Sequence, residues 1–234
     1  MSKLLLIFSA VMPIFVICFF VYRKDDEKEP FLLLIKLFIC GIMSVFLVYF
    51  FTYILQYFFS FFRFMPFSKN YFKLFIYIFI LIAAVEEISK FIMAYLFGYG
   101  DINFDQPYDI IVYTVFVSLG FACFENILYV MRNGLDNALL RAVTAVPIHA
   151  CYGIFMGYYL SLAKIARKNG AKGIHRRNII LSILVPILLH TLYDYLIFLN
   201  DPFCSLVLMV TIVIMYYFAF LRLIQMSNVQ VRHF

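Results

Sequence analysis

Residues 71–97 read YFKLFIYIFILIAAVEEISKFIMAYLF, an apolar run interrupted near its centre by Glu86, Glu87 and Lys90. The run is long enough for a helix to cross the roughly 30 Å of hydrocarbon in a bilayer. Charged side chains at that depth are costly and usually functional, so they must face other protein segments or a wet cavity. The stretch therefore predicts a membrane-spanning helix that carries part of a polar site.

The whole chain shares this apolar character. Of its 234 residues 65% are hydrophobic and the mean hydropathy is +0.96, against about 45–50% apolar residues in soluble domains. We predict an all-α, polytopic membrane helix bundle that forms one domain over residues 1–234. The net charge of +6 comes largely from basic loops, which in a membrane protein report orientation, so we expect a lipid bilayer and no nucleic acid as partner.

Seven apolar segments of about 20 residues each predict about seven transmembrane helices. They cover residues 4–22, 31–55, 71–97, 108–131, 142–163, 179–199 and 203–223. The first is expected to be a retained span, because it is longer than a signal-peptide core and ends in Arg23 and Lys24. The aromatic stretch from Gln56 to Phe67 is expected to lie in the interface or to extend the second span.

The basic residues predict the orientation. The loop 164–177 holds six Lys and Arg residues and is therefore expected in the cytoplasm. Alternating outward from it puts eleven basic residues inside and six outside, the six including Arg132 and Arg141. This distribution predicts that the N-terminus is outside and the C-terminus inside.

The spacing of the acids in the third segment has two interpretations. Glu86 and Glu87 diverge by about 100° around a helix, while Lys90 follows them at helical-neighbour spacing. One carboxyl can therefore face a cavity as a general acid or base while the other pairs with Lys90. A purely structural ion pair between helices explains the same pattern.

Polar residues also interrupt three later segments: Glu125 with Asn126, His149, and His190 with Asp194. Each of these, taken alone, fits a buried structural hydrogen bond. Asp194 follows His190 by four residues, the spacing at which an acid can fix the tautomer of an imidazole. In the predicted topology Glu125, His149 and His190 come within roughly 9–13 Å of the outer end at 1.5 Å per residue, with Glu86 nearer the centre. This common depth predicts one cavity that opens outward.

Two small-residue patterns predict close helix packing. Gly153 and Gly157 follow His149 with the spacing of a small-residue contact face, and Gly120 and Ala122 precede Glu125. The cysteines are odd in number, scattered and without a C-x-x-C pair, so they predict buried thiols and neither disulfides nor a zinc motif. They are Cys18, Cys40, Cys123, Cys151 and Cys204.

These motifs together resemble the PrsW family of intramembrane glutamic-type proteases, relatives of the CAAX prenyl endopeptidases. The resemblance lies in E-E-x-x-K at 86–90, F-x-x-x-E-N at 121–126, His149 with its glycines and H-x-x-x-D at 190–194. It extends to the segments 22–30, 103–113 and 118–121, and so covers most of residues 1–200. The chain departs from the family pattern at Ile110-Ile111, where a small residue after the Asp is more usual.

The resemblance implies a multi-pass protease of the bacterial cell membrane. It implies the site-1 cut in a single-span, membrane-anchored anti-sigma factor, which releases an extracytoplasmic-function sigma factor in response to envelope stress or antimicrobial peptides. By carry-over, Glu86 and Glu87 match the paired glutamates, and Glu125, His149 and His190 match the other polar motif positions. The prenyl-protease relatives have His where this chain has Glu125. No oligomeric state is predicted.

The expected chemistry is peptide hydrolysis without a cofactor. Glu86 takes a proton from water, Glu125 or His149 positions that water, and His190, held by Asp194, stabilises the oxyanion. Glu87 with Lys90 is a supporting ion pair, and Asn126 supports Glu125.

The sequence leaves four alternatives to this metal-free protease. A zinc-dependent protease fits the acids and imidazoles, although no H-E-x-x-H is present, and a thiol protease would use Cys151 or Cys123. A proton-coupled transporter also needs buried acids and histidines. A catalytically silent membrane scaffold is the fourth alternative.

Overall fold

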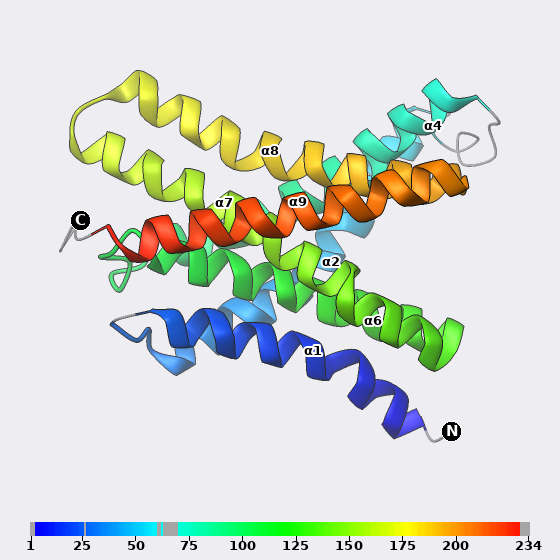
Figure 1. Cartoon of the computed structure of the whole chain (residues 1–234). Coiled ribbons are helices and arrows are strands. Elements are labelled where there is room, and N and C mark those ends of the chain that lie inside the picture. The colour runs from blue at the N-terminus through cyan, green and yellow to red at the C-terminus, as the bar shows by residue number, and fades with distance from the viewer. Residues whose placement is uncertain (1–2, 26, 60–61, 63–69, 230–234) are drawn as a thin grey trace.

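The computed structural model describes residues 3–25, 27–59, 62 and 70–229, and most of these residues lie in long helices (Figure 1). No strand occurs in these ranges, which confirms the all-α prediction. In chain order the helices are α1 (Lys3–Lys24), α2 (Phe31–Phe58), α4 (Tyr71–Tyr77), η2 (Ile78–Ala84), α5 (Val85–Ala94), η3 (Tyr95–Tyr99), α6 (Asp109–Val143), α7 (Ala145–Lys168), α8 (Lys172–Leu199) and α9 (Pro202–Ser227).

Five helical segments in the described part of the chain are long and apolar enough to cross a membrane. One of these segments, Asp109–Lys168, contains both α6 and α7. The run from 71 to 99 is not among the five, because it consists of four consecutive short helices. The seven predicted segments therefore each correspond to a helix or to a run of short helices, and the protein is a polytopic bundle.

The interrupted run 71–99 corrects the expectation of one regular span. η2 and η3 are π-helices, whose wider turns flank the ten α-helical residues of α5. Such turns are rare and occur frequently at functional sites. Here they bracket the segment that carries Glu86, Glu87 and Lys90, so the irregular backbone coincides with the charged side chains.

Two helices start at side-chain caps that the sequence supplies. The Asn70 side chain accepts hydrogen bonds from the amides of Phe72 and Lys73 at the start of α4. Asp201 does the same for the second and third residues of α9, and Pro202 occupies the first turn, where no backbone N–H is needed. α2 ends at Phe58, so the start of the stretch from Gln56 to Phe67 extends the second span, while residues 60–61 and 63–67 lie outside the described ranges.

The connections between the later helices are shorter than expected. α7 continues to Lys168 and α8 begins at Lys172, so most of the basic loop 164–177 is helical. α6 also continues well past residue 131 and ends at Val143, with a kink at Gly134, whose φ of 81° is a conformation that glycine adopts without strain. This extension corrects the assignment of Arg141 to an outer loop, because the residue lies in a helix next to the polar site.

The centre of the bundle is the pair α6 and α7, which are more buried than the other helices. Gly153 and Gly157 face α6 so closely that a Cβ added at either would lie within 3.0 Å of the α6 backbone. At position 120, an added Cβ would lie 2.0 Å from the Phe38 carbonyl oxygen of α2. These positions confirm the predicted small-residue packing, and α1, α2, α8 and α9 pack around the central pair.

The two chain ends lie at opposite ends of the bundle (Figure 1). The connection between α6 and α7 and the turn between α8 and α9 lie at the end that carries the N-terminus, and the connection between α7 and α8 lies at the other end. An odd number of membrane crossings produces this arrangement. The assignment of the N-terminal end to the outside remains a prediction from the distribution of basic residues.

Candidate active site

The two adjacent glutamates of α5 occupy different environments. The Glu86 side chain is 13% exposed and lines a cavity, whereas the Glu87 side chain is fully buried. Lys90 Nζ lies 2.7 Å from Glu87 Oε1 and 3.6 Å from Glu86 Oε2. The divergence of about 100° between neighbouring helical residues thus gives one carboxylate access to the cavity and fixes the other beside an ammonium group.

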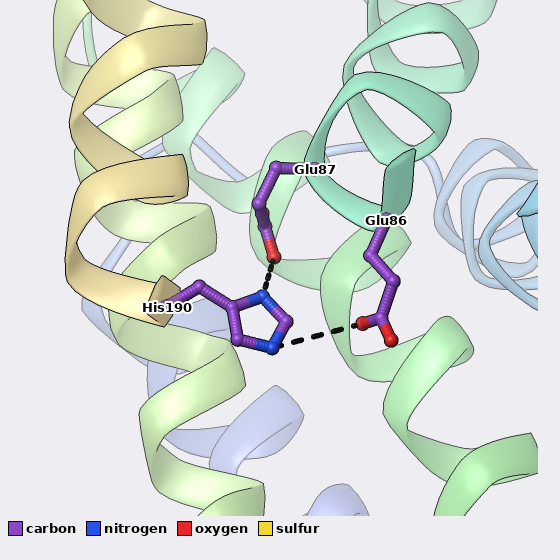
Figure 2. A group of neighbouring side chains, drawn as sticks. All are labelled: Glu86, Glu87 and His190. Carbon is purple, nitrogen blue, oxygen red and sulfur yellow. Dashed lines mark hydrogen bonds and ion pairs between the residues drawn. The ribbon is translucent and has the colours of Figure 1, made fainter. Parts of the chain in front are cut away.

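His190 of α8 joins both glutamates (Figure 2). Its Nδ1 lies 2.9 Å from Glu87 Oε1, and its Nε2 lies 3.9 Å from Glu86 Oε2. Asp194 Oδ2 is 3.4 Å from the same Nε2. The expected contact between Asp194 and His190 is therefore present, and Glu87 is a second and closer partner that was not expected. The shorter bond to Glu87 holds Nδ1, and this leaves Nε2 between Glu86 and Asp194.

His149 of α7 connects the glutamate pair to α6. Its Nδ1 is 3.3 Å from Lys90 Nζ, and its Nε2 is 3.0 Å from Glu125 Oε2. An ammonium group only donates hydrogen bonds, so Nδ1 must be the acceptor and Nε2 must carry the proton that is donated to Glu125. Both ring nitrogens are therefore engaged. The hydroxyl of Ser118 also donates to the His149 carbonyl at 2.6 Å, which fixes this part of α7 on α6.

Arg141 is a site residue that the sequence analysis missed. Its Nη2 lies 2.9 Å from Glu125 Oε2, and its Nε donates to Asn126 Oδ1 at 2.6 Å. Asn126 in turn donates to the Ala10 carbonyl of α1 at 2.7 Å. The one available signal was Glu125 itself, an acid with no basic residue in its own predicted span. Its partner comes from the continuation of α6 beyond Gly134.

Tyr152 is the second residue that was missed. Its ring is stacked on His190 with centroids 4.9 Å apart, and it meets the His149 ring edge-on at 5.7 Å. Its hydroxyl is buried and has no hydrogen-bond partner among the described residues. The signal was its position three residues after His149, which is about one helical turn.

The polar groups from four helices line one cavity of about 280 Å³. It contains Glu86 from α5, Glu125 and Arg141 from α6, His149 and Tyr152 from α7, and His190 and Asp194 from α8. Thr144, between α6 and α7, and Phe198, near the end of α8, also line it. The cavity thus extends toward the end of the bundle that carries the N-terminus. The prediction that these spans contribute to one cavity is confirmed, with the outward direction depending on the predicted orientation.

The cysteines lie apart from this cavity. All five are free thiols, and Cys18, Cys123 and Cys151 are buried, as expected of small apolar side chains. Neither Cys123 nor Cys151 is among the residues that line the cavity. The geometry therefore gives no support to the thiol-protease alternative.

Fold and site together define a class of protein: a multi-pass helical membrane protein whose carboxylates and imidazoles are enclosed among its spans, as hydrolysis within a bilayer requires. The chain belongs to the PrsW family of intramembrane proteases. The family model described as PrsW family intramembrane metalloprotease matches residues 29–221. This match confirms the family that the motifs resemble and a multi-pass location in the bacterial membrane.

The curated relatives agree with this family. Protease PrsW of Oceanobacillus iheyensis is 38% identical over 188 residues, which cover 80% of this chain and 80% of that protein. Protease PrsW of Geobacillus kaustophilus is 36% identical over 192 residues, covering 82% and 79%. Protease PrsW of Bacillus subtilis is 32% identical over 193 residues, covering 82% of each. No solved structure matches the chain significantly.

The family description names a metal, for which the candidate donors are Glu86, Glu87 and His190, each with one atom within 4.8 Å of the others. Three protein ligands and one open position are typical of catalytic zinc. However, Glu87 Oε1 is already hydrogen-bonded to His190 Nδ1 and paired with Lys90 Nζ. A zinc ion bound to Glu87 Oε1 and His190 Nδ1 would have to break the hydrogen bond between them. The Oε2 atoms of Glu86 and Glu87 are buried and have no hydrogen-bond partner among the described residues. A zinc ion at those oxygens would lie beside the ammonium group of Lys90, whose positive charge opposes a second cation.

Proposed function

We propose that this chain is an intramembrane endopeptidase of the glutamic type, which hydrolyses a peptide bond without a metal ion. The observation that carries the proposal is the contrast between Glu86, which lines the cavity, and Glu87, which is buried against Lys90 and His190. Glu86 Oε2 accepts no hydrogen bond from the described residues. This oxygen is buried on the side of Lys90 and His190, so a cavity water would bind the exposed side of the Glu86 carboxylate.

In the proposed reaction Glu86 acts first as general base. It takes a proton from the water while the water oxygen bonds to the carbonyl carbon of the scissile peptide. The carbonyl oxygen becomes an oxyanion and accepts a hydrogen bond from Nε2–H of His190. Glu86 then gives the proton to the leaving nitrogen as the C–N bond breaks. This sequence leaves a carboxylic acid and an amine and restores the Glu86 carboxylate.

His190 must be an imidazolium to donate from Nε2 while Nδ1–H is bonded to Glu87. The surrounding charges favour this state. Carboxylate oxygens of Glu87, Asp194 and Glu86 lie 2.9, 3.4 and 3.9 Å from the ring nitrogens. Glu87 is thus a positioning residue, which aims His190 Nε2 into the cavity.

The remaining polar residues are proposed to fix the carboxylate of Glu125 beside the water. The shared Oε2 of Glu125 accepts from His149 and Arg141 and is thereby held at one end. Since both nitrogens of His149 are engaged, His149 would position Glu125 and Lys90 and would not accept the proton of the water. Asn126 would orient Arg141, and Asp194 would assist His190.

The proposed substrate is a single-span, membrane-anchored anti-sigma factor, cut at site 1 so that an extracytoplasmic-function sigma factor is released under envelope stress. This part rests on the family resemblance. The direction of the cavity is compatible with it, because the end that carries the N-terminus is the predicted extracytoplasmic end. A cut near the outer surface would need a cavity open on that side.

The test is co-expression of the chain with candidate single-span anti-sigma proteins, followed by immunoblotting of the substrate. Wild type should produce a shortened fragment, whereas Glu86→Ala and Glu86→Gln should leave the substrate intact at unchanged membrane levels of the variant. Full cleavage by a Glu86 variant would refute the assignment of the base. Cleavage of other membrane proteins, with every candidate anti-sigma protein intact, would refute the substrate class alone.

A further inference from the structure

A second acidic cluster lies at the opposite end of the bundle from the active-site cavity. Asp25 and Glu29 belong to the connection between α1 and α2, and Asp109 is the first residue of α6. One carboxylate oxygen from each lies within 4.8 Å of the others. All three residues are buried, with exposed fractions of 2%, 6% and 1%. The proposed hydrolysis makes no use of them.

One oxygen of the buried Asp109 carboxylate lacks a hydrogen-bond partner among the described residues. Its Oδ2 accepts hydrogen bonds from the amides of Asp105 and Gln106 at 3.0 and 2.6 Å. Its Oδ1 is buried and has no hydrogen-bond partner among the described residues. A buried carboxylate oxygen without a donor is costly unless an ion, a proton or a water satisfies it. Oδ1 is therefore the atom of Asp109 that is available to a ligand.

Glu29 is held by a neutral group. The hydroxyl of Tyr113, one helical turn after Asp109, donates to Glu29 Oε2 at 2.5 Å. Burial raises the pKa of Glu29 to about 8, and the nearby carboxylates of Asp109 and Asp25 add to this increase against the opposing effect of the Tyr113 hydrogen bond. The hydrogen-bond donor to Glu29 thus brings no positive charge to this carboxylate.

Two lysines of this region donate hydrogen bonds to backbone carbonyls. Lys28 Nζ donates to the backbone carbonyls of Tyr22, Arg23 and Asp25, where it caps the end of α1. Lys164 Nζ donates to the Phe104 carbonyl and lies over the Phe104 ring. Within the described part of the chain, no basic side chain forms an ion pair with Glu29 or Asp109.

We propose that Asp25, Glu29 and Asp109 bind one hard divalent cation, Mg²⁺ or Ca²⁺, which fastens the α1–α2 connection to the start of α6. All donors are oxygens, the ligand type that these cations prefer. Oxygens on opposite sides of a calcium ion lie up to about 5 Å apart at Ca–O distances of 2.3–2.6 Å, so a spacing within 4.8 Å suits one shared ion. The active-site acids differ, because an imidazole and an ammonium group lie beside them as positively charged or hydrogen-bonding partners.

The test uses the full-length chain purified in detergent and stripped of divalent ions with EDTA. Thermal unfolding is then followed during titration with MgCl₂ and, separately, CaCl₂. A ligand that binds the native state at a concentration of 100 Kd should raise the midpoint of the wild type by about 5–10 °C. The two salts identify the preferred ion, and isothermal titration gives the number of ions bound per chain.

The variants are Glu29→Gln and Asp109→Asn, with Glu27→Gln as the matched control. Glu27 belongs to the same connection, two residues from Glu29, and is exposed. The control should keep the full cation-dependent shift, and both cluster variants should lose it together with the bound ion. Glu29→Gln is the decisive variant if Asp109→Asn fails to fold, because it leaves the backbone hydrogen bonds to Asp109 intact.

Two outcomes would overturn the proposal. A shift that persists in Glu29→Gln would show that the cation binds elsewhere. A wild type that does not respond to either ion, together with a Glu29→Gln variant as stable as the wild type or more so, would show that protons neutralise the cluster. Both readouts are independent of peptide cleavage, so they remain informative even if the proposed function is wrong.

Discussion

Glu87 and His190 are 103 residues apart in sequence, and their side chains meet at 2.9 Å. This contact joins α5 to α8 inside the bundle and determines which nitrogen of His190 faces the cavity. The same glutamate holds Lys90, whose amine reaches His149. One fully buried carboxylate thus aligns three groups, while the neighbouring Glu86 remains available to water.

The substitutions Glu86→Gln and Glu87→Gln should have different effects on cleavage and on thermal stability. Glu86→Gln should lower cleavage at least about 100-fold, the usual loss when a general base is removed, with little change in thermal stability. Glu87→Gln should also reduce cleavage, but it should in addition destabilise the protein, because Lys90 and His190 lose their buried counter-charge. Cleavage by immunoblot and unfolding midpoints of the purified variants measure the two effects. Identical losses of stability in both variants would contradict the division of roles.

The ion pair between Glu87 and Lys90 should show strong coupling. Removing one member of a buried pair typically costs about 3–5 kcal/mol, because the other charge is left unpaired. The losses of unfolding free energy in Lys90→Met and in Glu87→Gln should therefore add up to more than the loss in the double variant. A double-mutant cycle of unfolding free energies measures the coupling. Additive effects would mean that the pair contributes nothing specific to the bundle.

Much of the fold follows from hydrophobic length and small-residue spacing. The apolar segments fixed which stretches are helical, and Gly153 and Gly157 indicated the packing of α7 on α6. The π-helical turns around α5 were not predictable, because apolar composition does not distinguish a regular helix from one with wider turns. The long α6 was also missed, since polar residues after position 131 normally indicate a loop.

The candidate site was predictable where its residues interrupt apolar segments. A charge inside a span is a strong signal, and it identified Glu86, Glu125, His149 and His190, which the structure brings together. The partners of these residues were harder to predict. The choice of Glu87 over Asp194 as the closer partner of His190 depends on helix rotation, which spacing along one helix does not determine.

Arg141 should be required for cleavage. Its guanidinium holds Glu125 and Asn126 at once, a fork geometry that lysine cannot reproduce. Arg141→Gln and Arg141→Lys should both reduce cleavage about tenfold or more, whereas Arg132→Gln, at an exposed position of the same helix, should leave it unchanged. The readout is initial cleavage rate at equal membrane levels. Wild-type activity in Arg141→Lys would show that charge alone is sufficient at this position.

Metal removal should not affect the reaction. If Lys90 supplies the positive charge beside the glutamates, purified enzyme should cleave a reporter substrate equally well before and after treatment with EDTA and 1,10-phenanthroline. Any loss on EDTA treatment must be compared in the Glu29→Gln variant, whose proposed cation site is removed. Activity that both proteins lose and regain with zinc would contradict the metal-free mechanism and would assign zinc to Glu86, Glu87 and His190.

Two substitutions of Tyr152 distinguish the contribution of its ring from that of its hydroxyl group. The ring stacks on His190 and contacts His149, whereas the hydroxyl has no hydrogen-bond partner in the described part of the chain. Tyr152→Phe should therefore retain cleavage and stability. Tyr152→Ala should lose about 3–5 kcal/mol of unfolding free energy and most of the activity, because a buried aromatic ring is replaced by a cavity and His190 is no longer supported. Cleavage rates and unfolding midpoints of the two variants measure this difference. If Tyr152→Phe were inactive but stable, the hydroxyl would have to donate to the substrate, and His190 would not act alone on the oxyanion.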